Sequence, residues 1–269
     1  MALHFMYITN DVEIARICQK CGIDRIWIDM EYKGKNERQK GMDSVKSHHT
    51  IDDITKIKPI LDASELLVRV NPIDAESEKE INDAIGAGAD IIMLPMAKTL
   101  EEIKTFNDII EGRCKKVLLL ETKEAVENID AFLETGIFDE IHIGLNDLSL
   151  SYNLKFMFQL LSNGIVGNLC NKIAQYEIPY GFGGIAQLGK GILPAEMIIP
   201  EHIRLGSTRV ILSRSFYNVN NMTSYGEAEK IITDELAKIK KYEQTISLWN
   251  DIDFCRNKKH LIQRVNAVL

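Results

Sequence analysis

Residues 118–151, LLLETKEAVENIDAFLETGIFDEIHIGLNDLSLS, contain the clearest strand and helix pattern of the chain. The run at 116–120 is largely apolar without alternation, which is typical of a strand covered on both faces in a parallel sheet, and a second strand run follows at 140–143. A helical pattern over 125–133 lies between them, so the stretch has the length of one β-α-β crossover. The sequence therefore predicts two neighbouring parallel strands joined by a helix.

Two carboxylates, Glu121 and Asp147, lie just beyond the ends of these runs. In parallel strands both would meet at the carboxyl edge, where α/β proteins build their sites. Two carboxylates there repel each other unless a proton or a cation lies between them, and a divalent ion such as Mg²⁺ prefers oxygen ligands. Alternatively, each carboxylate caps the helix that follows it. The pattern alone leaves both interpretations open.

Composition bounds the class of protein. A chain of 269 residues with 45% hydrophobic residues can bury one large core, and we expect one barrel rather than two small domains. The net charge of -7 and the lack of a basic tract argue against nucleic-acid binding. No apolar run is long enough to span a membrane, and the start MALHFMYIT lacks the features of a signal peptide, so we expect a cytoplasmic protein.

Short apolar runs recur along the chain, and helical patterns separate them. The expected strands are residues 3–8, 25–30, 66–70, 91–94, 116–120, 140–143, 179–184 and 210–212. A period of about 25 to 30 residues without a linker predicts an α/β fold, a TIM (β/α)₈ barrel, as a single domain over 1–269. Residues 222–269 form a helical extension, which we expect to serve oligomerisation.

Four motifs resemble the HpcH/HpaI aldolase and citrate lyase superfamily, whose members are TIM barrels acting on 2-oxo acids. LLLET at 118–122 and IGLNDLS at 143–149 are similar to its metal-binding segments. GAGADIIMLPMAKTLEEI at 86–103 matches over its whole length, and GIDRIWIDMEY at 22–32 resembles the second-strand signature of the HpaI branch. The resemblance covers about 5–216 and is closer to the HpaI branch.

The resemblance implies roles for particular residues. Glu121 and Asp147 would hold a divalent metal, Mg²⁺ or Mn²⁺ with Co²⁺ as a further candidate. Arg69, in LLVRVN, would contact the substrate's keto oxygen and stabilise an enolate; a structural salt bridge to a barrel carboxylate is the alternative. The substrate carboxylate would be held by backbone N–H groups of one segment, namely Gly144, Leu145, Asn146 and Asp147.

One position departs from the family pattern, because Tyr32 stands where the HpaI branch has a histidine for proton transfer. Tyrosine, with a pKa near 10, is a poorer base at neutral pH. The polar segment 33–50 is not expected to pack as a core element, but it carries His48 and His49 and could fold over the mouth of the barrel. The proton carrier stays open among Tyr32, His48, His49 and water on the metal; a solvated loop with incidental histidines is the alternative.

The expected reaction is reversible aldol cleavage of an adduct between a 2-oxo acid, such as pyruvate, and an aldehyde. A citrate-lyase-like enzyme acting on acyl thioesters is a second hypothesis. A barrel that has lost turnover and works as a binding protein is a third, and Tyr32 favours it. The resemblance also implies a homo-oligomer, and we expect no nucleic-acid or membrane partner.

Overall fold

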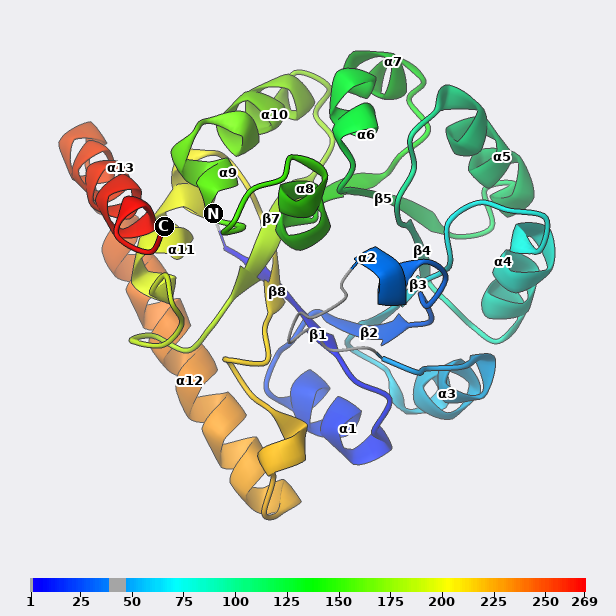
Figure 1. Ribbon diagram of the computed structural model, residues 1–269. Coiled ribbons are helices and arrows are strands. Elements are labelled where there is room, and N and C mark those ends of the chain that lie inside the picture. Colours follow the sequence, from blue (N-terminus) through cyan, green and yellow to red (C-terminus); the bar gives the residue numbers. More distant parts are fainter. Residues whose placement is uncertain (1, 39–46) are drawn as a thin grey trace.

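The computed structural model describes residues 2–38 and 47–269, and their strands form one closed parallel barrel (Figure 1). The strands are β1 (His4–Ile8), β2 (Arg25–Asp29), β3 (Glu65–Arg69), β4 (Ile91–Leu94), β5 (Lys115–Leu120), β6 (Glu140–Ile143), β7 (Tyr180–Ile185) and β8 (Arg209–Leu212). Each strand pairs in parallel with the next along the chain, and β8 returns to β1 to close the cylinder. The predicted TIM-barrel fold is thereby confirmed.

Helices follow the strands along the chain, and most of them surround the barrel (Figure 1). They are α1 (Val12–Lys20), α2 (Lys35–Arg38), α3 (Ile51–Ile57), α4 (Ser77–Gly86), α5 (Leu100–Ile110), α6 (Lys123–Glu127), α7 (Ile129–Glu134), α8 (Leu145–Ser151), α9 (Gln159–Ser162), α10 (Ile165–Ala174), α11 (Ala195–Arg204), α12 (Tyr225–Ile246) and α13 (Asp251–Asn266), with short 3₁₀ turns η1 (Lys58–Ile60) and η2 (Val219–Asn221). Helix α3 ends at Ile57, because Pro59 has no N–H to continue the α-helical pattern and the chain tightens into η1.

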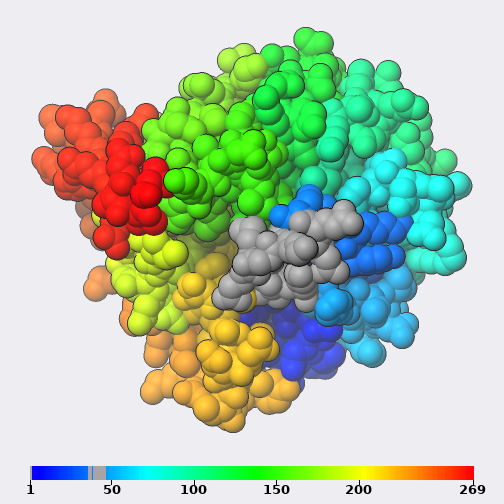
Figure 2. Space-filling view, in the orientation of Figure 1, coloured from blue at the N-terminus to red at the C-terminus, as the bar shows by residue number. Residues whose placement is uncertain are grey.

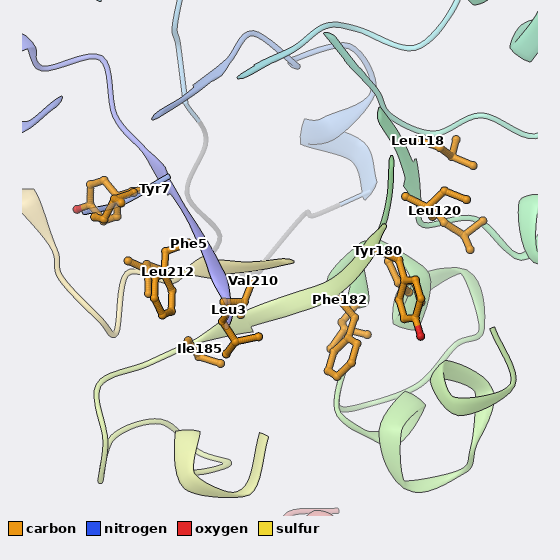
Figure 3. Packing of buried hydrophobic residues seen from close by; sticks show 14 of the residues in the cluster. Leu3, Phe5, Tyr7, Leu118, Leu120, Tyr180, Phe182, Ile185, Val210 and Leu212 are labelled. Atoms are coloured by element: carbon orange, nitrogen blue, oxygen red, sulfur yellow. The ribbon is translucent and has the colours of Figure 1, made fainter. Parts of the chain in front are cut away.

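Strands such as β5 are apolar on both faces because two separate hydrophobic clusters cover them. Leu118 and Leu120 of β5 point toward the surrounding helices, and Figure 3 shows them together on one side of the strand. Leu119 points the opposite way, into a cluster inside the barrel that includes Trp27 and Met93. Both faces of the strand are therefore buried, which removes the period-2 pattern of a half-exposed strand.

The C-terminal helices extend beyond the barrel. Helix α12 packs beside α1 and α11, and α13 packs on α9 and α11. In the space-filling view the red end of the chain, α13, projects from one side of the molecule (Figure 2). Within the described ranges, no helix combines the length and the apolar character that crossing a bilayer requires.

Candidate active site

A cavity of about 430 Å³ opens at the carboxyl ends of the barrel strands. Charged side chains gather on one part of its wall, namely Asp29, Lys35, Arg69, Glu121 and Asp147, and Arg214 after β8 also lines the cavity. Apolar side chains from the loops after β6 and β7 and from α11 line another part: Phe156, Met157, Phe158, Ile192, Leu193 and Ile198. A concave site with a few converging polar groups is the usual form of a small-molecule site.

Glu121 and Asp147, predicted to lie together, both line this cavity. Glu121 follows β5 and is 3% exposed, while Asp147 lies in the first turn of α8 and is 8% exposed. The backbone N–H of Met96 donates to Glu121 Oε1 over 3.2 Å, and Met96 takes a left-handed conformation (φ 55°), which is unfavourable for a residue with a side chain. The loop after β4 thus holds the Glu121 carboxylate in place.

The helix-capping alternative does not account for Glu121. Thr122 is the N-cap of α6, and its hydroxyl accepts the N–H of Ala125. Gly144, just after β6, lies close to the Glu121 carboxylate: a Cβ on Gly144 would lie 2.8 Å from Glu121 Oε2. The absence of a side chain at 144 therefore lets the end of β6 approach Glu121.

The electrostatics of Glu121 favour a cation. Burial raises the pKa of its carboxyl well above the ordinary value, and the negative charges of Asp147 and Glu31 raise it further. Within residues 2–38 and 47–269, no group of three or more His, Cys, Asp or Glu side chains is placed to hold a metal ion. Mg²⁺ needs only one or two carboxylates when substrate oxygens and water complete its shell. Glu121 and Asp147 could therefore hold such an ion together with a substrate.

Arg69, at the end of β3, pairs with the carboxylates of the second strand segment. Its Nε and Nη2 donate to the two oxygens of Asp29, each over 2.8 Å, and its Nη1 lies 3.2 Å from Glu31 Oε2. The guanidinium also lies over the Trp27 ring, 5.2 Å from its centroid. Burial alone would raise the pKa of Asp29, but Arg69 and Lys35 outweigh it and hold that pKa below its ordinary value. The predicted alternative for Arg69, an ion pair with a barrel carboxylate, is confirmed, and Arg69 lines the cavity as well.

As predicted, the described residues of 33–50 belong to neither hydrophobic core, but α2 packs on the barrel through its charges. Lys35 is 4% exposed, and its Nζ lies 3.0 Å from Asp29 Oδ2 and 3.6 Å from Glu31 Oε2. Arg38 forms an ion pair with Glu31, and its Nε lies 3.4 Å from Asp147 Oδ1. Buried carboxylates on the barrel bind these cations and so seat a helix that has no apolar face. Residues 39–46 of the segment lie outside the described residues.

The three candidate proton carriers are not among the described residues that line the cavity, although His49 contacts the backbone of Asp29. Tyr32 is 59% exposed, and its N–H donates to Asn71 Oδ1 over 3.0 Å. His48 is exposed, whereas His49 Nδ1 accepts the backbone N–H of Asp29 over 3.0 Å. Burial lowers the pKa of His49. Among the residues that the structure describes, those lining the cavity do not include these three.

The segment predicted to hold a substrate carboxylate lines the cavity with all four of its residues, Gly144, Leu145, Asn146 and Asp147. Gly144 is the N-cap of α8. The first N–H groups of a helix have no partner within the helix, so they can bind an acceptor.

His142 is a cavity residue that the sequence reasoning missed, as it missed Lys35. It is fully buried in β6, and its Nε2 lies 3.2 Å from the carbonyl oxygen of Gly183. Burial lowers its pKa to about 4. Its signal was a histidine between two isoleucines in the strand run 140–143, two positions before the Gly144 that opens the site.

Comparisons with known proteins agree on family and fold. The family model described as HpcH/HpaI aldolase/citrate lyase matches residues 4–156. A search of curated proteins gives no match. An HpcH/HpaI aldolase/citrate lyase family protein from Burkholderia cenocepacia J2315 is similar in structure, with a TM-score of 0.64, 14% identity, and coverage of 84% of this chain and 94% of that chain.

Two further solved structures resemble the chain to a similar degree. The HpcH/HpaI aldolase from Desulfitobacterium hafniense DCB-2 has a TM-score of 0.60 at 13% identity, covering 83% of this chain and 95% of its own. The citrate synthase SbnG has a TM-score of 0.60 at 15% identity, covering 90% of this chain and 95% of its own. At such low identities these likenesses speak for the fold alone.

Proposed function

Because the chain belongs to the HpcH/HpaI aldolase/citrate lyase family, we propose that it is a divalent-metal-dependent carbon–carbon lyase. Its substrate would be an aldol adduct of a pyruvate-like 2-oxo acid and an aldehyde. The observation that carries the proposal is that Glu121, Asp147 and Arg69 line one cavity at the carboxyl ends of the strands. A divalent cation held by Glu121 and Asp147 would supply Lewis-acid chemistry there when bound.

The proposed cleavage of a 4-hydroxy-2-oxo acid balances without an external oxidant or reductant. The hydroxyl loses its proton, the C3–C4 bond breaks, and the aldehyde leaves with its new carbonyl. The electron pair of that bond passes into an enolate, which takes a proton at C3 to give the 2-oxo acid. Aldol formation is the same sequence reversed.

Residues of this chain would stabilise the enolate and hold the substrate carboxylate through their positions in the cavity. Arg69 would lie beside the developing enolate, and its two bonds to Asp29 and its contact with Trp27 fix the guanidinium before substrate arrives. The N–H groups at the start of α8 would bind the substrate carboxylate. Since Tyr32, His48 and His49 are not among the lining residues described, we propose that water in the cavity carries the proton.

Pyruvate release tests the proposal. We expect the purified protein to release pyruvate from 4-hydroxy-2-oxo acids with Mg²⁺ or Mn²⁺, and to lose this activity after EDTA until metal is restored. E121Q and D147N should lose activity, whereas E124Q, at an exposed position on α6, should keep it. Equal activity with and without EDTA would overturn the metal dependence.

The competing functions predict different results from the same preparation. Turnover of acyl thioesters without turnover of hydroxy-oxo acids would identify the citrate-lyase-like function instead. Binding of pyruvate without any turnover would identify a binding protein.

A further inference from the structure

His142 is a buried polar side chain inside the barrel. It lies on β6 opposite Leu119 of β5, which belongs to the cluster inside the barrel. The side chain is 0% exposed and lines the cavity. Strand β6 ends at Ile143, so His142 lies just below Gly144 and the start of α8.

The partner of one ring nitrogen fixes what the other can do. Nε2 lies 3.2 Å from the Gly183 carbonyl oxygen, which can only accept a hydrogen bond. Nε2 therefore carries the proton, and Nδ1 has a lone pair that can only accept. Gly183 takes a left-handed conformation (φ 51°), and a Cβ there would lie 2.6 Å from Leu145 Cδ1. Glycine at 183 thus keeps this carbonyl in place.

Nδ1 has no hydrogen-bond partner among the described residues, although the atom is buried. Buried polar atoms are nearly always paired, and an unpaired acceptor destabilises the folded state. A donor supplied by a bound molecule would remove that penalty. Burial also keeps the ring neutral, since it lowers the pKa of His142 to about 4, so the lone pair is available at ordinary pH.

We propose that His142 is a specificity-determining residue whose Nδ1 accepts a hydrogen bond from the hydroxyl group of a hydroxy-2-oxo acid. The inference rests on the proposed lyase function. At neutral pH the carboxylate and keto oxygens of such a substrate only accept hydrogen bonds, and its hydroxyl is the group that donates. His142 would therefore distinguish the aldol adduct from 2-oxo acids without the hydroxyl, since a site with an unpaired buried acceptor rejects analogues lacking the donor.

Two variants separate the ring nitrogens. H142N keeps an amide near Nδ1, which can accept, but does not reach Gly183. H142Q keeps an amide near Nε2, which can donate to Gly183, but lacks an acceptor near Nδ1. The two side chains have the same chemistry, so each is the control for the other.

The two variants are compared by two reactions in the presence of Mn²⁺. The first is cleavage of the 4-hydroxy-2-oxo acid formed from pyruvate and acetaldehyde. The second is exchange of pyruvate methyl protons with D₂O, measured by NMR, which needs the enolate but no hydroxyl. We expect the ratio of cleavage kcat/KM to exchange rate to fall about tenfold to a hundredfold in H142Q and to stay within about threefold of wild type in H142N.

A substrate-side measurement leaves the protein unchanged. The wild type should bind the hydroxy-2-oxo acid about tenfold or more tightly than 2-oxopentanoate, the same acid without its hydroxyl. H142Q should lose this preference.

The outcomes distinguish the two proposals. A wild type that neither cleaves nor exchanges overturns the lyase function and this inference with it. A wild type that does both, with H142N and H142Q changed to the same extent or not at all, overturns the role of His142 and leaves the lyase function standing. A wild type that binds the hydroxy-2-oxo acid no more tightly than 2-oxopentanoate also overturns the role of His142 and leaves the lyase function standing.

Discussion

We predict that protonation of the buried His202 ring destabilises the folded protein in mild acid. It lies in α11, is 0% exposed, and stacks on Phe182 with the ring centroids 3.8 Å apart and the planes 6° from parallel. Its Nδ1 lies 2.7 Å from the Ser207 hydroxyl oxygen. Burial, with a smaller contribution from nearby His142, lowers the pKa of His202 from 6.5 to about 3. The folded state therefore holds this ring neutral where an unfolded chain would protonate it.

The size of the effect follows from the difference in pKa. Because the folded-state value lies below the unfolded value of 6.5, the stability contributed by the neutral ring is complete above about pH 6.5 and is lost as the pH falls toward 3. Each pH unit in that window costs about 1.4 kcal/mol. Between pH 7 and pH 5, His202 alone should lower the free energy of unfolding by about 2 kcal/mol.

Urea unfolding at pH 7 and pH 5 measures this loss. H202N removes the titrating ring and keeps an amide near the Ser207 hydroxyl. The loss of unfolding free energy between pH 7 and pH 5 should therefore be about 2 kcal/mol smaller in H202N than in wild type. H260N, at an exposed position on α13, is the matched control and should keep the wild-type difference. Equal differences in H202N and wild type would refute the reasoning, whatever the variant's stability at pH 7.

Three further predictions concern the mouth of the barrel and the C-terminal helices. G144A should lower lyase activity by about tenfold or more and should also lower Tm, because the new Cβ would lie 2.8 Å from Glu121 Oε2 and 2.9 Å from Glu121 Cβ; full activity would contradict the role given to this contact. R69M should lower the free energy of unfolding by about 3–5 kcal/mol, since it leaves buried Asp29 without its bidentate partner, and R69M/D29N should recover part of the loss; additive losses in urea would contradict the coupling. L248E, at a leucine 86% exposed after α12, should lower the molar mass measured by light scattering if residues 222–269 form the predicted oligomer interface, and an unchanged mass would count against this residue's part in it.

The barrel could be predicted from the sequence because its information is local. The run that forms β5 is apolar without alternation and one helical pattern separates it from the run that forms β6, so length and order along the chain are enough to predict parallel strands. The positions of Glu121 and Asp147 at the cavity followed from the same order. The end of α3 before η1 could also have been predicted from Pro59, although we did not predict it.

The contribution of α2 to the charged wall of the cavity could not be predicted in this way. Helix α2 has four residues and no apolar periodicity, and what holds it is the charge of Asp29 and Glu31. The one local signal was spacing, since Lys35 follows Glu31 by four residues, as partners on one helical face do. That the partners would be buried depends on how β2 and β3 pair, which a single stretch of sequence does not encode.

Asp29 and Glu121 are both buried carboxylates on one cavity wall, yet their pKa values shift in opposite directions. Burial raises both, so the difference comes from what each carboxylate contacts. Asp29 accepts two bonds from Arg69, which offsets its burial, whereas Glu121 accepts one backbone N–H and faces the charges of Asp147 and Glu31. A cation entering the cavity would therefore gain most beside Glu121. Arg69, already paired with Asp29, would then act as a fixed charge that orients the substrate beside the cation.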